Sequence, residues 1–254
     1  MSRTVLRPAH PDPRASRATA VAGARARRLV RAVVAGVGTA AALLLLGLLV
    51  RDRWDPLVRF DERTVVAATS FAARYPALVR ALLDWQWAFE GVHLFVPVAA
   101  LCLLVWWRTR MTSRTWWALA TIATAWAFAN LAKEVARRAR PVLDDPIDQV
   151  RGYSFPSGHA ANTAAMATAL VVLVWPVLRS RGLRVAAVLG AAALMVLTGL
   201  DRVMLGAHFP SDVLAGTVFG VGLVLASYLG YRGWSPPHDD TTEGSTDRTS
   251  KETR

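Results

Sequence analysis

Basic side chains recur at regular spacing in the segment from Lys133 to Pro141. If a helix continues through this segment, Lys133, Arg137 and Arg140 lie on one side through i+4 and i+7 spacing, and Pro141 ends the helix. A row of cations on one face suits a multiply charged anion. For this segment alone, a basic patch that binds lipid head groups at a membrane surface is an equally good interpretation.

A second polar segment, Pro156-Ser-Gly-His159, immediately precedes an apolar stretch. Ser157 is a good N-cap, Gly158 lets an anion approach the backbone, and the open N–H groups of a helix N-terminus attract negative charge. The pattern predicts a phosphate cradle with His159 on its rim. Taken alone, a capped helix start with an interfacial histidine is the simpler interpretation.

The third segment holds Arg202, His208 and Asp212 within eleven residues, too few for the three side chains to lie far apart. Asp212 can hydrogen-bond one ring nitrogen of His208, which fixes the tautomer and leaves the other nitrogen free to attack an electrophile. Taken alone, a structural polar contact is the better interpretation of this histidine and aspartate.

Long apolar segments separate these polar ones and must position them. The chain has 254 residues, of which 54% are hydrophobic and only 19% are charged, which is too apolar for an ordinary soluble domain. Tryptophans cluster at the ends of the apolar segments, as expected at a membrane interface. The predicted fold is all-α, a bundle of six transmembrane helices. The six segments are about Leu29–Val50, Ala88–Trp107, Trp116–Leu131, Ala160–Leu178, Val185–Leu200 and Val213–Tyr231.

The two ends of the chain differ from this apolar domain. Residues 1–28 are rich in arginine and proline, and residues 235–254 are rich in Asp, Thr, Ser and Glu. We therefore expect a disordered basic tail over 1–28, the six-span domain over 29–234 and a disordered polar tail over 235–254. A cleaved signal peptide is a poorer interpretation of the N-terminus, because its apolar core has only about 7–15 residues.

The distribution of charge predicts the orientation. The formal net charge is +12, but the basic residues are dispersed between apolar segments, which disfavours a nucleic-acid partner. Two short loops, around Arg108–Arg114 and Arg179–Arg184, have three arginines each and no acidic residue. Because cytoplasmic loops carry an excess of Lys and Arg, we expect these loops and both termini in the cytoplasm. The three polar segments then lie on the extracytoplasmic side.

The segment Arg51–Trp87 between the first two spans is long enough for helices that lie on the outer membrane surface. Asp61, Glu62 and Asp84 in this segment are expected to be solvated carboxylates. The sequence shows no carboxylate or His/Cys set with metal-ligand spacing, so no metal or cofactor is expected. Cys102 lies inside an apolar segment and has no intramolecular disulfide partner.

Together, the three polar segments resemble the signatures of the type 2 phosphatidic acid phosphatase superfamily, which also includes vanadium-dependent haloperoxidases. The signatures are Lys-x6-Arg-Pro, Pro-Ser-Gly-His and Ser-Arg-x5-His-x3-Asp, and they occur here in the same order between Lys133 and Asp212. Asp201 stands where the family usually has serine. Its carboxylate either pairs with Arg202, which would weaken the hold on a phosphate, or points into the outer water.

This resemblance implies metal-independent hydrolysis of a phosphomonoester or pyrophosphate on a membrane lipid, at the plasma membrane. His208 would attack phosphorus, Asp212 would orient it, and His159 would protonate the leaving oxygen. The groups that would bind the phosphate are Lys133, Arg140, Ser157, Gly158 and Arg202. The candidate lipids are phosphatidic acid, phosphatidylglycerophosphate and a polyprenyl diphosphate.

Two other functions remain compatible with these residues. A phosphotransferase would pass the phosphoryl group from His208 to an alcohol instead of water. A non-catalytic protein that binds or transports lipid phosphates would keep the anion cradle without turnover.

Overall fold

Eight helices and no strand make up the part of the chain that this computed structural model describes, residues 13–143, 147 and 151–234. The prediction of an all-α fold is confirmed. The helices are α1 Pro13–Arg51, α2 Asp55–Ala73, α3 Pro76–Ala88, α4 Gly91–Thr109, α5 Thr112–Ala136, α6 Gly158–Val174, α7 Arg181–Met204 and α8 Pro210–Trp234.

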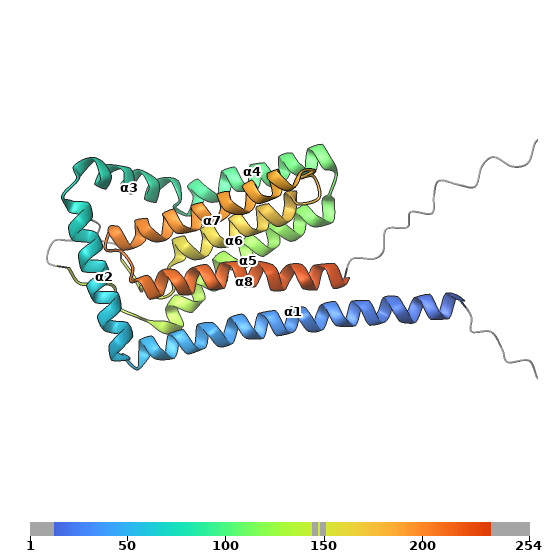
Figure 1. The fold of residues 1–254 in the computed structure, drawn as a ribbon, viewed down its shortest axis with the longest axis horizontal. Coiled ribbons are helices and arrows are strands. Elements are labelled where there is room, and N and C mark those ends of the chain that lie inside the picture. The colour runs from blue at the N-terminus through green and yellow to red at the C-terminus, as the bar shows by residue number, and fades with distance from the viewer. Residues whose placement is uncertain (1–12, 144–146, 148–150, 235–254) are drawn as a thin grey trace, which may run out of the picture.

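Helices α1 and α4 to α8 run side by side as a bundle, whereas α2 lies across one end of it (Figure 1). Helix α8 packs most extensively against α1 and α6. The start of α1, the end of α8 and the α4–α5 and α6–α7 turns lie together at the end far from α2 (Figure 1). The start of α6 and the α7–α8 turn lie at the α2 end.

Four helices are long and apolar enough to cross a membrane: Val21–Arg51, Gly91–Thr109, Arg181–Met204 and Pro210–Arg232. Large apolar side chains such as Val33, Leu44 and Leu189 are exposed on them, which suits a lipid environment. The other two predicted spans correspond to α5 and to α6, which has only 17 residues. The predicted count of six spans is therefore not confirmed.

Helix α1 begins earlier than the first predicted span. It starts at Pro13, inside the segment 1–28 that we expected to be disordered. The segment is rich in alanine and arginine, which favour helices, and proline is well tolerated in the first helical turn. Residues 1–12 and the predicted polar tail 235–254 lie outside the described residues.

Small residues let α6 and α8 approach closely. A Cβ atom at Gly216 of α8 would lie 2.5 Å from the carbonyl oxygen of Ser157, and one at Gly220 would overlap the backbone of Ala161. The start of α8 is thereby held against the first turn of α6. This contact brings the third polar segment of the sequence next to the second.

Candidate active site

The predicted cradle forms at the N-terminus of α6. Ser157 is the N-cap, and its hydroxyl accepts a hydrogen bond from the backbone N–H of Ala160 at 3.5 Å. The Nζ atom of Lys133 lies 3.3 Å from the position that a Cβ atom would occupy on Gly158. Because Gly158 lacks a side chain, the ammonium group lies directly against this helix start. Two positive features, a cation and open N–H groups, therefore coincide there.

Arg140 brings a second cation to the imidazole of His208. Its Nη1 atom lies 3.2 Å from Nε2 of His208 and also donates to the carbonyl oxygen of Ala207 at 2.7 Å. Its Nε atom donates to the carbonyl oxygen of Gly152 at 3.1 Å. A guanidinium group can only donate, so Nε2 of His208 acts as acceptor and the ring proton lies on Nδ1.

The other ring nitrogen of His208 faces Asp212, but the contact is looser than predicted. Nδ1 lies 3.7 Å from Oδ2 of Asp212, which is too long for a direct hydrogen bond. The hydroxyl of Ser154 lies 3.4 Å from this Nδ1 and donates to the same carboxylate oxygen. Ser154 is fully buried and was missed as a site residue, because a lone serine three residues before Ser157 carries no distinctive spacing.

Burial sets the protonation state of His208, whose side chain is only 2% exposed. Burial lowers the pKa of His208 to about 4, against the opposing effect of Asp212 and with help from the cations Arg140 and Lys133. The imidazole is therefore neutral near pH 7. A neutral ring with an unprotonated Nε2 is the form that can act as a nucleophile.

The last turn of α7 presents Arg202, which is almost completely buried. Its Nε atom donates to Oδ2 of Asp201 at 2.8 Å, and its Nη2 atom donates to Oε1 of Gln86 on α3 at 2.7 Å. Of the two orientations considered for Asp201, the pairing with Arg202 is therefore the observed one. Gln86 was not predicted as a site residue.

His159 is the second residue of α6, next to the cradle. Its Nε2 atom is buried and has no hydrogen-bond partner among the residues that the structure describes. The hydrogen-bonding capacity of this atom is therefore unused by the described residues.

The segment after Lys133 differs from the predicted continuous helix. Helix α5 ends at Ala136, and Arg137 follows in the left-handed conformation with a φ of 46°. Its side chain is exposed, so the prediction that Arg137 shares a face with Lys133 and Arg140 is wrong. The next residue, Arg138, turns inward, and its Nη1 atom donates to Oδ1 of Asp212 at 2.6 Å.

Asp61 is a second correction, since we expected its carboxylate to be solvated. It is fully buried on α2 and accepts a hydrogen bond from Nη2 of Arg138 at 2.8 Å. Glu62 and Asp84 are exposed, as predicted. Asp61 lies on the buried face of α2 with Val65, Thr69 and Ala72. That helical spacing is the one sequence signal that could have identified it.

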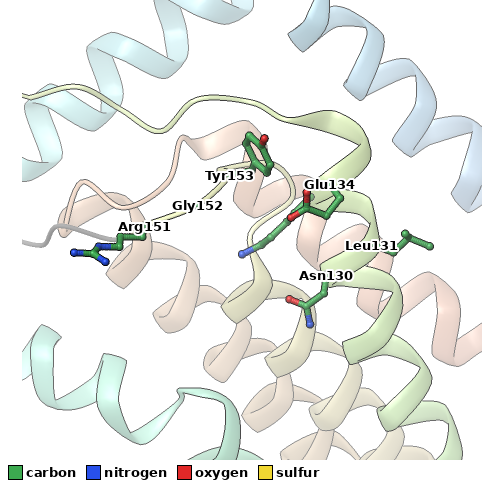
Figure 2. A pocket seen from close by; sticks show the side chains of 7 residues that line it. Asn130, Leu131, Glu134, Arg151, Gly152 and Tyr153 are labelled. Atoms are coloured by element: carbon green, nitrogen blue, oxygen red, sulfur yellow. The ribbon is translucent and has the colours of Figure 1, made fainter.

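Cationic side chains of the site line two cavities. One, of about 490 Å³, is lined by Asn130 and Glu134 of α5 and by the segment that contains Arg151 and Tyr153 (Figure 2). Lys133 also lines this cavity. The other cavity, of about 1190 Å³, is mainly apolar and lies between α1, α2 and α5, with Arg138 and Arg140 in its wall. Lys133 and Arg140 thus lie in the walls of two different cavities.

The family model of the PAP2 superfamily matches residues 114–235 of this chain. A lipid A 1-phosphatase of Rhizobium etli is 32% identical over 126 residues, which cover 44% of this chain and 47% of the relative. Phosphatidylglycerophosphatase B of Bacillus subtilis is 36% identical over 99 residues, which cover 38% of this chain and 46% of the relative. A decaprenylphosphoryl-5-phosphoribose phosphatase of Mycobacterium tuberculosis is 36% identical over 115 residues, 42% of this chain and 57% of the relative.

The chain thus spans about half the length of the curated relatives it matches. The similarity in fold covers more of the chain than the sequence matches do. A crystal structure of a transmembrane PAP2-type phosphatidylglycerolphosphate phosphatase from Bacillus subtilis superposes with a TM-score of 0.67 at 24% identity. The superposition covers 76% of this chain and 94% of the Bacillus subtilis chain. The all-α fold is therefore that of a multi-pass membrane protein. In its motifs, in the family match over residues 114–235 and in this fold, the chain is similar to the PAP2 superfamily.

Proposed function

We propose that this protein is a membrane phosphatase that hydrolyses a phosphomonoester or pyrophosphate on a lipid through a phosphohistidine at His208. The observation that carries the proposal is the contact between Nε2 of His208 and the guanidinium group of Arg140, at 3.2 Å, beside the N-terminus of α6. A neutral nucleophile and a phosphate-binding cation thus share one location. Lys133, Ser157, Gly158 and Arg202 complete the proposed phosphate site.

The large cavity supports a lipid substrate. Its wall combines apolar side chains such as Leu44, Leu48 and Phe128 with the cationic Arg140 at one end. A molecule with a phosphate next to a long apolar chain would fit this arrangement. The phosphate would contact the cationic part of the wall, and the chain would contact the apolar part. The names of the relatives refer to phosphatidylglycerophosphate, lipid A and a decaprenyl phosphoribose, all of which combine these two parts.

In the first step, Nε2 of His208 attacks phosphorus, the N–P bond forms and the bond to the lipid oxygen breaks. Arg140, Arg202 and Lys133 stabilise the negative charge that spreads over the phosphoryl oxygens. His159 gives a proton to the leaving oxygen, and a bound phosphate would favour the protonated ring that this requires. Asp212, with Ser154, keeps the ring proton of His208 on Nδ1 and stabilises the positive charge of the phosphorylated ring.

In the second step, water attacks phosphorus while His159 takes its proton. The N–P bond breaks and neutral His208 is restored, with inorganic phosphate and the dephosphorylated lipid as products. The described residues contain no cluster of three or more His, Cys, Asp or Glu side chains that would hold a metal ion. We therefore assign charge neutralisation to the three cations and propose that the reaction needs no metal.

We also propose that six helices cross the plasma membrane, α5 and α6 among them. The start of α1, the end of α8 and the two arginine-rich loops lie at one end of the bundle, and the start of α6 and the α7–α8 turn lie at the other (Figure 1), which supports a cytoplasmic and an extracytoplasmic end. In a Cys102→Ala background, cysteine at Arg151 should react with an impermeant thiol reagent on intact cells. Cysteine at Arg110 should react only after permeabilisation, and the reverse pattern would contradict this orientation.

The function is tested by phosphate release from a panel of lipid phosphates in detergent, without an added alcohol acceptor and with excess EDTA. The wild type should release phosphate, and His208→Ala should lose about 10⁴-fold or more of this activity. His93→Ala is the matched control, because His93 is an exposed histidine on α4. Release by His208→Ala at the wild-type rate would contradict the proposal, and release only with an added alcohol would indicate a phosphotransferase.

A further inference from the structure

Two buried carboxylates share a single arginine at the α2 end of the bundle. Asp61 and Asp212 are both fully buried, and the side chain of Arg138 between them is 13% exposed. Nη1 of Arg138 donates to Oδ1 of Asp212 at 2.6 Å, and Nη2 donates to Oδ2 of Asp61 at 2.8 Å. The flat guanidinium group thus bridges the two acids with different nitrogens, a geometry that lysine cannot reproduce.

Asp61 also contacts the start of α8 directly. The backbone N–H of Ser211 donates to Oδ1 of Asp61 at 3.0 Å, and the hydroxyl of Ser211 donates to Oδ2. The hydroxyl of Ser211 also accepts a hydrogen bond from Arg138 at 2.7 Å. A carboxylate from α2 therefore takes the place of a cap at the N-terminus of α8, one residue before Asp212.

The charges of this group explain why a second acid is needed. With Asp212 alone, Arg138 would neutralise the carboxylate that must stabilise a positively charged His208 ring. With Asp61 on its other side, Arg138 is shared, and the three groups together keep one net negative charge. Because all of them are buried, that charge acts on His208 with little screening by water.

We propose that Asp61 is a positioning residue for the reaction of His208. It holds Arg138 and the start of α8 so that Asp212 keeps both its place and its charge beside the imidazole. This inference rests on the proposed function, since it assigns Asp61 a part in forming phosphohistidine. Asp61 itself does not touch the substrate in this scheme.

The test compares Asp61→Asn, which keeps the shape and removes the charge, with Asp55→Asn. Asp55 lies on the same helix and pairs with Arg59, but its side chain is 82% exposed. The readouts are the rate of phosphohistidine formation from an activated aryl phosphate, the KM, the inhibition by vanadate and the unfolding temperature in detergent. Asp61→Asn should form phosphohistidine about 10- to 100-fold more slowly. Its KM should stay near the wild-type value, because the phosphate-binding groups are unchanged, whereas inhibition by vanadate, a mimic of the transition state of attack by His208, should weaken along with the rate.

A double-mutant cycle with Arg138→Gln separates positioning from a general loss of packing. If Asp61 acts through Arg138, the rate lost in the double variant is smaller than the product of the two single losses. If Asp61→Asn does not fold, Arg138→Lys serves instead. It keeps the charge but not the bridge, and should show the same loss of rate with an unchanged KM.

Three results would overturn the inference. A wild-type rate in Asp61→Asn would show that the carboxylate plays no part in the reaction, and equal losses in Asp55→Asn would show an unspecific effect of charge. Multiplicative losses in the cycle would show that Asp61 does not act through Arg138. A wild-type protein that forms no phosphohistidine with any substrate would overturn the proposed function as well.

Discussion

The segment from residue 114 onward and the α2–α3 pair contribute different kinds of side chain to one site. The first supplies Lys133, Arg140 and His208, which meet at the start of α6 and are proposed to contact the phosphate. The second supplies Asp61 and Gln86, whose described contacts are with other side chains of the site or with the start of α8.

This comparison explains why the family match covers only the first region. A group that must fit a phosphate has a restricted choice of residue type and spacing. A group that holds an arginine in place can be any acceptor that reaches it, from any neighbouring helix. Supporting residues are therefore harder to find from motifs, even when they lie within 3 Å of motif residues, as Gln86 does.

The largest expected effect comes from the phosphate-binding region. Arg140→Ala should lower kcat/KM about 10²- to 10³-fold, because it removes a charge donor aimed at the reacting phosphoryl group. Phosphate release under steady-state conditions measures the change. Arg74→Ala is the matched control, since Arg74 is an exposed arginine at the C-terminal end of α2 and lines neither cavity. Arg137→Ala should lose less than Arg140→Ala, because the side chain of Arg137 lines the large cavity but is exposed. A comparable loss in Arg137→Ala would restore the original prediction that both arginines face the substrate.

A smaller effect is expected from the supporting region. Gln86→Ala removes the hydrogen bond to Nη2 of Arg202 and should lower kcat/KM about 10-fold, on the scale of a hydrogen bond to a charged group of about 1.5–3 kcal/mol. The same assay serves as the measurement. Asp84→Asn, at an exposed position of α3, should have no effect. A loss in Gln86→Ala as large as that of Arg140→Ala would remove the distinction between the two regions.

Asp201 lies in the first region but acts as a support, so it tests the boundary between them. Asp201→Ser should lower the KM about fivefold, because Arg202 would no longer be partly neutralised, a change on the scale of a screened charge interaction of about 1 kcal/mol. Asp55→Ser, at an exposed position of α2, controls for the loss of one acidic side chain. An unchanged KM would mean that the pair with Asp201 does not limit phosphate binding.

The smallest effect is expected from mild acid. Burial lowers the pKa of His208 to about 4, so its ring stays neutral as the pH falls from 7 to about 5. Formation of phosphohistidine from an aryl phosphate whose leaving group needs no proton should therefore hardly change over this range. The rate should fall only as the pH approaches 4, where the ring becomes protonated. A midpoint near the ordinary histidine value of about 6.5 would show that His208 is not buried as described.

Particular residues show how far the sequence could be read. The order of the motifs, the N-cap at Ser157 and the apolar periodicity of the helices are local properties, and they predicted the all-α fold and the residues that gather around His208. The end of α5 was predicted less well. The left-handed turn at Arg137 depends on what the following residues contact, so the helical spacing selected Arg137 where the structure turns Arg138 inward.

The sequence by itself indicated which side chains are candidates to bind a phosphate, because their types and their spacing within each motif are characteristic. Only the tertiary structure decided which charges are buried and which partners they have. Asp61 and Arg138 are separated by 77 residues, and Gln86 and Arg202 by 116. A buried aspartate and a solvated one cannot be told apart in the sequence. The free energy of burying the charged carboxylate is offset by a partner that only folding brings into contact with it.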